Sequence, residues 1–406
     1  MLGKVLGLGK PSGAEFTSLV ASLGTERGYF VDPQIDPAAM TIVAANARLS
    51  LQPMYEVFLE LPRKDRQRFI DEVVLGALDS SQEEVPEPDW DSVRSMLLPV
   101  IRDAGYLACA ALEIAQLAGD DPAPEIAYRE LAPGLFTTLV IDDANHMSLV
   151  TQDMLAHWDV RFDIAFEIAL AKLEGVSDAP FQQIAPGLWA APWSDSYTAA
   201  RLLLPDLVHR LCASPLVAIP DRNTLLVADP AAPNAFETLM GAISQADDPY
   251  PITRRIFQLE GETLREIAPP HTDAGAAFAR MFLDEKLEAY EREKTMHREA
   301  CPYAEEVLIS LKGLARGDDT FTTAVWTQHV EHGLLPPADF VLFQEWKDEL
   351  GPQGAGKTWP VPWSRVVTEP SLVTATTRPL PRWKCLAFPS RVWLEQHSQP
   401  LGPARR

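Results

Sequence analysis

The stretch GLFTTLVIDD, residues 134–143, carries the clearest secondary-structure signal in the chain. Its short apolar run, rich in β-branched side chains, is typical of a buried strand. The following segment, TQDMLAHWDVRFDIAFEIALAKLEG (residues 151–175), has helical apolar spacing and ends in a glycine that suits a helix C-terminus. A buried strand followed by helices predicts a sheet against which helices pack.

The segments around this strand predict further short strands and helices. FQQIAPGLWAAPW (residues 181–193) indicates strand, and DSYTAARLLLPDLVHRLC (195–212) indicates a helix with Asp195 or Ser196 as its N-cap. PLVAIPDRNTLLVAD (215–229) indicates two strands around a turn, and ITRRIFQLEGETLREIA (252–268) indicates a hairpin. Strands and helices therefore mix without the regular alternation of a doubly wound fold. We expect the α+β class, with a mixed, mostly antiparallel sheet.

At 406 residues, the chain is long enough for more than one domain. We expect an N-terminal α+β section over residues 1–130, a central α+β domain over 131–270, and a C-terminal α+β extension over 271–406. The extension begins with a long amphipathic helix near residues 273–300. A second helix is predicted at YAEEVLISLKGLA (303–315), followed by strands and a Trp/Pro-rich end.

The chain is strongly acidic, with a formal net charge of -22 and a pI near 4.7. Such a charge disfavours nucleic acids and anionic membranes. It would attract a basic protein partner, but acidity is also the common route to solubility, and that explanation is favoured. The four cysteines lie far apart and fit reduced thiols in a cytosolic protein. We expect a cytoplasmic protein with no nucleic-acid or membrane partner, no cofactor and no bound metal.

One string matches a phosphate-binding loop in its letters. Residues 351–358, GPQGAGKT, fit the pattern GxxxxGK[ST]. A true phosphate loop is followed by a helix whose N-terminus faces the phosphates, but here Pro360 and Pro362 follow almost at once. We therefore interpret the string as a glycine-rich turn and expect no nucleotide to bind to it.

Three blocks of the middle section also suggest a relationship. LVIDDANHMSLVTQDMLAHW, DSYTAARLLLPDLVHRL and LVAIPDRNTLLVAD, in this order, resemble the YtpQ-like family of uncharacterised bacterial cytosolic proteins. ARLSLQPMYEVF and MLLPVIRDAG fit the N-terminal part of that family. The resemblance covers roughly residues 14–268 and leaves the C-terminal extension unplaced. It implies a shared fold unit and a bacterial cytosolic origin, without an established activity.

The candidate catalytic residues are Asp142, Asp143, Asp195, Asp221 and Arg222. Carboxylates at strand ends can converge to hold Mg²⁺ or to act as a general acid and base, and an arginine could bind an anion. The same aspartates are also common in turns and helix caps, and the arginine could form a structural ion pair. The structural roles are favoured.

The last third holds six of the ten tryptophans. Trp359, Trp363, Trp383 and Trp393, interleaved with prolines, are candidates for a partner-binding surface, or they anchor a small β-rich core. Because no catalytic constellation is assembled in the sequence, we expect a non-enzymatic protein-interaction or adaptor protein. The alternative is a metal-dependent hydrolase or phosphotransfer enzyme that uses the strand-end aspartates.

Overall fold

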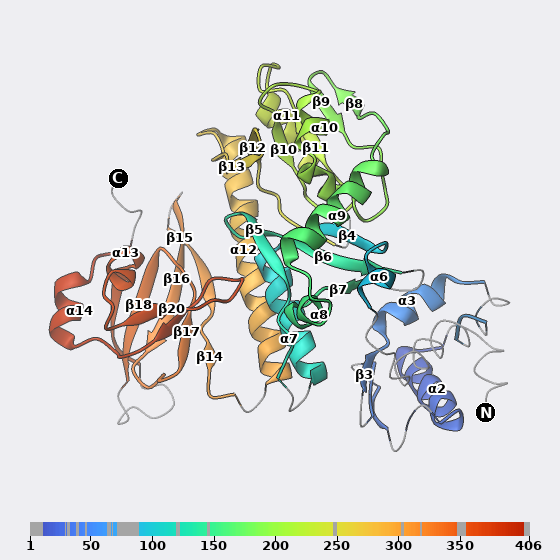
Figure 1. The fold of residues 1–406 in the computed structure, drawn as a ribbon. Helices are drawn as coiled ribbons and strands as arrows, with labels where there is room; N and C mark the ends of the chain where they lie inside the picture. Colours follow the sequence, from blue (N-terminus) through green and yellow to red (C-terminus); the bar gives the residue numbers. More distant parts are fainter. Residues whose placement is uncertain are drawn as a thin grey trace. The chain divides into compact units, whose positions relative to one another are not determined.

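A computed structural model divides the chain into two compact units, residues 1–88 and 89–406, each of which is described by itself. The structure describes residues 11–401 except 29, 31–32, 38–39, 45–46, 63–65, 67, 71–88, 119–121, 144–146, 247–249, 302–303, 317–318 and 347–354. Helices and mostly antiparallel sheets are present in both units, which confirms the α+β class (Figure 1).

The first unit packs helices beside a small antiparallel sheet. Its described elements are α2 (Gly13–Glu26), β1 (Gln34–Asp36), β2 (Thr41–Ala44), β3 (Ala47–Ser50) and α3 (Gln52–Glu60). A capping box begins α2, because Ser12 accepts the amide N–H of Glu15 while the Glu15 carboxylate accepts the N–H of Ser12. Phe16 of α2 and Phe58 of α3 meet at a ring-centroid distance of 4.9 Å in the core of this unit.

The second unit contains the strand that the sequence marked most clearly. It is β6 (Leu135–Asp142), in which every residue before Asp142 is buried. The strand lies at the centre of an antiparallel sheet with β4 (Leu97–Asp103), β5 (Tyr128–Ala132) and β7 (Met147–Leu149). The helices of this region are α6 (Trp90–Val93), α7 (Ala104–Ala118), α8 (Gln152–His157) and α9 (Phe162–Gly175). The boundary predicted after residue 130 falls inside β5.

A second sheet follows, with strand order β13-β12-β10-β11-β9-β8. Its antiparallel strands are β8 (Gln182–Ala185), β9 (Leu188–Ala190), β10 (Leu216–Ala218), β11 (Leu226–Ala228), β12 (Phe257–Glu260) and β13 (Thr263–Glu266). The helical segments are η2 (Ala199–Leu203), α10 (Pro205–His209) and α11 (Ala235–Ile243). The predicted helix over 195–212 is thus two short helices, joined where Pro205 begins α10.

The C-terminal part forms two four-stranded sheets, β14-β17-β21-β20 and β15-β16-β18-β19. The strands are β14 (Val307–Leu308), β15 (Leu311–Arg316), β16 (Asp319–Thr327), β17 (Gly333–Leu335), β18 (Phe340–Trp346), β19 (Ala355–Pro362), β20 (Val373–Ala375) and β21 (Trp383–Cys385), and the helices are α13 (Trp363–Val367) and α14 (Arg391–His397). The helix predicted at 303–315 is therefore wrong, because this segment supplies β14 and β15. Its apolar residues pair with neighbouring strands that the local pattern does not reveal.

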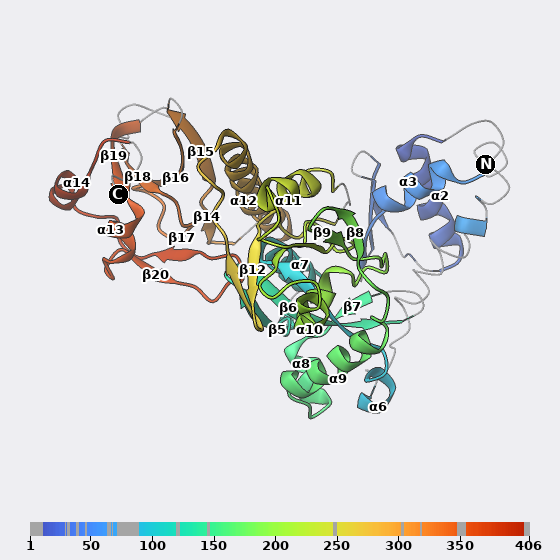
Figure 2. The same ribbon diagram turned by 90° about the horizontal axis from the view of Figure 1, so that it is seen from above.

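The 28-residue helix α12 (Asp273–Ala300) joins these parts of the second unit. It packs beside α7 and also beside β15, as both views show (Figure 1 and Figure 2). One hydrophobic core contains Leu107 of α7, Tyr290 of α12 and Trp326 of β16. The C-terminal sheets therefore share a core with elements from before residue 270.

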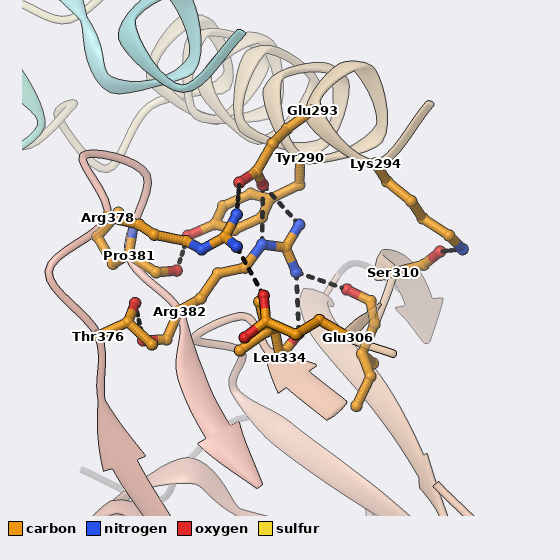
Figure 3. Close-up of polar contacts among 11 residues, drawn as sticks. Tyr290, Glu293, Lys294, Glu306, Ser310, Leu334, Thr376, Arg378, Pro381 and Arg382 are labelled. Atoms are coloured by element: carbon orange, nitrogen blue, oxygen red, sulfur yellow. Dashed lines mark hydrogen bonds and ion pairs between the residues drawn. The ribbon is translucent and has the colours of Figure 1, made fainter. Parts of the chain in front are cut away.

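A buried ion pair connects α12 to the C-terminal strands. Glu293 of α12 and Arg382 are each about 1% exposed, and the Arg382 Nε donates to the Glu293 Oε2 at 2.8 Å (Figure 3). The Arg382 Nη1 donates to the carbonyl oxygens of Ile309 and Leu334, both at 3.0 Å. One guanidinium, just before β21, thus ties α12 to the β14 and β17 region.

Further polar contacts surround this ion pair. The guanidinium of Arg382 lies 5.1 Å from the ring centroid of Tyr290, whose hydroxyl donates to the carbonyl of Pro381 at 2.9 Å. Arg378 lies between two carboxylates, 3.7 Å from Glu293 and 2.9 Å from Glu306 (Figure 3). Burial lowers the pKa of the nearby His297, so this ring favours its neutral form.

We predict that Arg382→Met will destabilise the second unit by about 3–5 kcal/mol, because it leaves the buried Glu293 carboxylate short of its main counter-charge. Urea unfolding measured by circular dichroism gives the change in free energy. The control is Arg391→Met, which removes an exposed pair with Glu395 and should change stability by less than about 0.5 kcal/mol. Equal effects of the two substitutions would contradict the prediction.

Candidate functional site

A cavity of about 550 Å³ lies beside α12. Its walls come from α12, from the end of β4, and from the segments near Pro220 and Ile252. Charged residues of both signs line it: Asp103, Arg254, Glu285, Glu288, Glu291 and Arg292. A concave surface with convergent charged groups is the feature of this unit best suited to hold a ligand.

Asp103 is placed by the junction between β4 and α7. As the last residue of β4, it accepts the amide N–H groups of Gly105 and Tyr106 at 2.7 and 3.1 Å and so caps the start of α7. Gly105 allows α7 to approach α12 closely, since a Cβ atom there would lie 2.9 Å from the Cβ of Ala289. This close approach brings Asp103 to the α12 side of the cavity.

Glu285 is the second carboxylate held by backbone groups. Its Oε2 accepts the amide N–H of Arg254 at 2.8 Å. Burial raises the pKa of Asp103 and of Glu285, and the negative charge of Asp103 adds to the rise at Glu285. Hydrogen bonds oppose the rise in both pKa values without cancelling it. The charge of Arg292 has the same effect at Asp103, and the charge of Arg255 has it at Glu285. The surrounding groups therefore offset only part of the cost of burying the negative charges of Asp103 and Glu285.

The two arginines of the cavity are also incompletely paired. Within the described part of the chain, the guanidiniums of Arg254 and Arg292 make no hydrogen bond or ion pair at contact distance. Arg292 acts on Asp103 only through its charge. Arg254 is half-buried and Arg292 is exposed, so the donors of both guanidiniums remain available on the cavity.

The predicted catalytic aspartates have other partners. Asp195 accepts the Nη1 and Nη2 groups of the fully buried Arg201 at 2.9 and 2.7 Å. Burial tends to raise the pKa of Asp195, but the bonds from Arg201 and from the Tyr197 amide outweigh it and lower that pKa. Asp195 is thus part of a structural ion pair, and it caps no helix.

Asp221 and Arg222 lie at the turn after β10. Asp221 is 2% exposed and accepts the amide N–H of Asn223 at 2.8 Å, as in an Asx turn. The guanidinium of Arg222 stacks over the exposed ring of Tyr250 at 3.6 Å from the ring centroid. The carboxylate of Asp195, with which Arg222 could have formed a structural ion pair, is bound by Arg201.

Asp142 and Asp143 lie at the end of β6, both half-buried. The pKa of Tyr197 is raised mainly by burial and, to a smaller extent, by the contact of its hydroxyl with Asp142. Among the residues that the structure describes, no three His, Cys, Asp or Glu side chains form a group that could hold a metal ion.

The four candidate tryptophans pack against the C-terminal core. Trp359 is 2% exposed within that core, and Trp363, Trp383 and Trp393 are half-buried against it. The rings of Trp363 and Trp383 meet edge to face at 4.9 Å, and Trp393 stacks on His397 at 4.3 Å. Each therefore has a packing role, and Trp359 is too deeply buried to contact a partner in this conformation.

The phosphate-loop string ends in a strand. Residues 351–354 lie outside the described residues, whereas Gly356, Lys357 and Thr358 belong to β19, which pairs antiparallel with β18. Lys357 lies 4.0 Å from Glu395 and 5.2 Å from the ring centroid of Trp359. A strand paired in this way does not aim its amides at a phosphate as a helix N-terminus does.

Comparison of the chain with protein-family models, curated proteins and solved structures found no match. The cavity therefore has to be interpreted from its own geometry. Sequence reasoning missed Asp103, Glu285, Arg254 and Arg292, because they come from distant segments. The one local signal was an acidic residue at a strand end with a glycine two residues later, in IRDAG (residues 101–105).

We predict that Lys357→Ala will change the free energy of unfolding by less than about 0.5 kcal/mol, since this exposed side chain makes only weak contacts. Thermal unfolding followed with and without Mg-ATP provides the measurement, and the nucleotide should leave Tm unchanged in both proteins. A rise in Tm with ATP that disappears in the variant would mean that the string binds nucleotide.

We also predict that two of the four free thiols resist modification in the native protein. Burial raises the pKa of Cys109 to about 11 and that of Cys385 to about 12, so almost no thiolate forms at pH 8. Titration with an aromatic disulfide reagent should therefore modify only the half-buried Cys212 and Cys301 until denaturant is added. Rapid native modification that is lost in Cys109→Ser or Cys385→Ser would disprove this.

Proposed function

We propose that this chain is a non-enzymatic protein-interaction or adaptor protein that binds a basic partner. Four carboxylates and two guanidiniums line the cavity beside α12, so the lining is negative when all of these groups are ionised. This acidic, concave surface is the observation that carries the proposal. It also agrees in sign with the net charge of -22, which would steer a basic partner toward the protein.

The outer part of this surface is accessible to a large partner. Glu288 and Glu291 line the cavity from α12, and both are exposed. Among the described residues, Glu291 makes one long ion pair, with Lys312, at 3.8 Å between exposed groups. Such a pair contributes little in water, so a basic side chain of a partner could replace it at small cost.

The enzyme alternative receives less support. Asp195 and Asp221 already accept hydrogen bonds that fix local structure, and the described residues hold no metal-binding group. No described helix is long and apolar enough to cross a membrane. A cytoplasmic location, and a bacterial origin within a YtpQ-like family, are part of the proposal and rest on the sequence patterns alone.

We predict that the double charge reversal Glu288→Lys/Glu291→Lys will weaken partner binding at least tenfold, because like charges would then face a basic surface. The tagged wild type captures partners from the native cell, and binding of a purified partner is then measured at low and high salt. Wild-type binding should weaken as salt increases.

The matched control is Glu167→Lys/Glu174→Lys, which makes the same charge change at exposed positions of α9. This control should retain the partner. If both double variants bind equally well, the cavity is not the docking surface. If the wild type captures no specific partner, the interaction role itself is wrong.

A further inference from the structure

We infer that the interior of the cavity beside α12 is a binding site for a small zwitterion, with an ammonium and a carboxylate on one molecule of amino-acid or dipeptide size. This ligand class goes beyond the proposed partner interaction, which involves the exposed rim residues Glu288 and Glu291. The groups of this site are the half-buried Asp103, Glu285 and Arg254 and the exposed Arg292 at its mouth.

The acidic groups are prepared to receive a cation. Asp103 uses Oδ1 for the amide N–H groups of Gly105 and Tyr106, and Glu285 uses Oε2 for the amide of Arg254. These backbone bonds fix the orientation of each carboxylate, and the Thr253 side chain also bonds to Glu285. An ammonium group has three N–H donors, so it can bond to both carboxylates at once.

The basic groups are prepared to receive an anion. The guanidiniums of Arg254 and Arg292 line the same cavity, and among the described residues neither has a hydrogen-bonded or ion-paired carboxylate. Elsewhere in this unit, the buried Arg201 and Arg382 each bind a carboxylate at 2.7–2.8 Å. A ligand carboxylate would give the cavity arginines the partner that the protein provides to the other two.

The cavity lining carries both negative and positive charges, and this combination favours one class of ligand over others. A purely anionic ligand would face four carboxylates, and a purely cationic ligand would face two guanidiniums that already have no partner. Along α12, Glu285 and Arg292 are seven residues apart, which places them on one face about 10 Å apart along the axis. A molecule that carries both charges satisfies both ends of the cavity, and the volume of about 550 Å³ accommodates it.

The test uses the purified full-length protein and a panel of free L-α-amino acids and glycine-containing dipeptides. Thermal shift identifies binders, and isothermal titration calorimetry measures Kd. Each binder is then compared with its N-acetyl and its carboxamide derivative, each of which lacks one charge. At least one zwitterion should bind, and both blocked derivatives should bind at least tenfold more weakly.

Two variants locate the binding. Arg292→Gln removes an exposed guanidinium, and Asp103→Asn keeps an oxygen that can still cap α7, so both should fold. Each should weaken the zwitterion at least tenfold. The matched controls on α12 are Arg298→Gln and Asp284→Asn, both exposed and outside the cavity lining, and both should bind as the wild type does.

Three results would overturn the inference. They are the absence of any binding zwitterion, equal binding of a singly charged derivative, and equal binding by the Arg292 and Arg298 variants. None of these measurements involves a protein partner. Failure here therefore leaves the proposed adaptor role to be judged by the rim variants alone.

Discussion

The second unit depends on one buried charge, the carboxylate of Glu293. A carboxylate at 1% exposure is tolerated only with a counter-charge at contact distance, and Arg382 provides it at 2.8 Å. Arg382 also donates to two carbonyl groups beside the neighbouring strands, so its own position is fixed. Since Glu293 has to face Arg382, the rotation of α12 about its axis is fixed as well. With 3.6 residues per turn, a helix that turns Tyr290 and Glu293 toward the strands turns Glu285 and Arg292 to a different face. The ion pair on one face thereby sets the orientation of the cavity on another.

Two fully buried arginines of the second unit differ from the two arginines at the cavity. Arg201 and Arg382 are fully buried, each paired with a carboxylate and each stacked on an aromatic ring, at 4.2 Å from Trp193 and 5.1 Å from Tyr290. Arg254 and Arg292 lie at the cavity, and neither makes such a contact with a residue that the structure describes. Since abundant carboxylates are present in the chain, this difference reflects the placement of the arginines and not a shortage of partners. It is the physical basis for assigning a ligand to the cavity.

The sequence predicted the parts of this fold that local periodicity controls. The β-branched run that forms β6, the hairpin of β12 and β13, and the long helix α12 all follow from side-chain spacing. Residues 303–315 show the limit, because Val307, Leu308, Leu311 and Leu314 have spacing that also suits a helix. Their pairing with β17 and β16 is decided by contacts with distant segments. The cavity is likewise non-local, since Asp103 and Glu285 belong to different elements and meet only after α7 and α12 pack together.

That packing explains why a cavity persists among long charged side chains. Gly105 and Ala289 are the small residues at which α7 and α12 come closest, and a larger side chain at residue 105 would collide with Ala289. The charged residues of α12 on either side of this contact cannot enter it, because moving a charge into such a tight contact would remove its water without providing a partner. They remain around an open space, and backbone amides hold two of the carboxylates in fixed orientations. These amide bonds offset part of the cost of burying each charge, and they hold the carboxylates in place for a ligand that supplies the opposite charge.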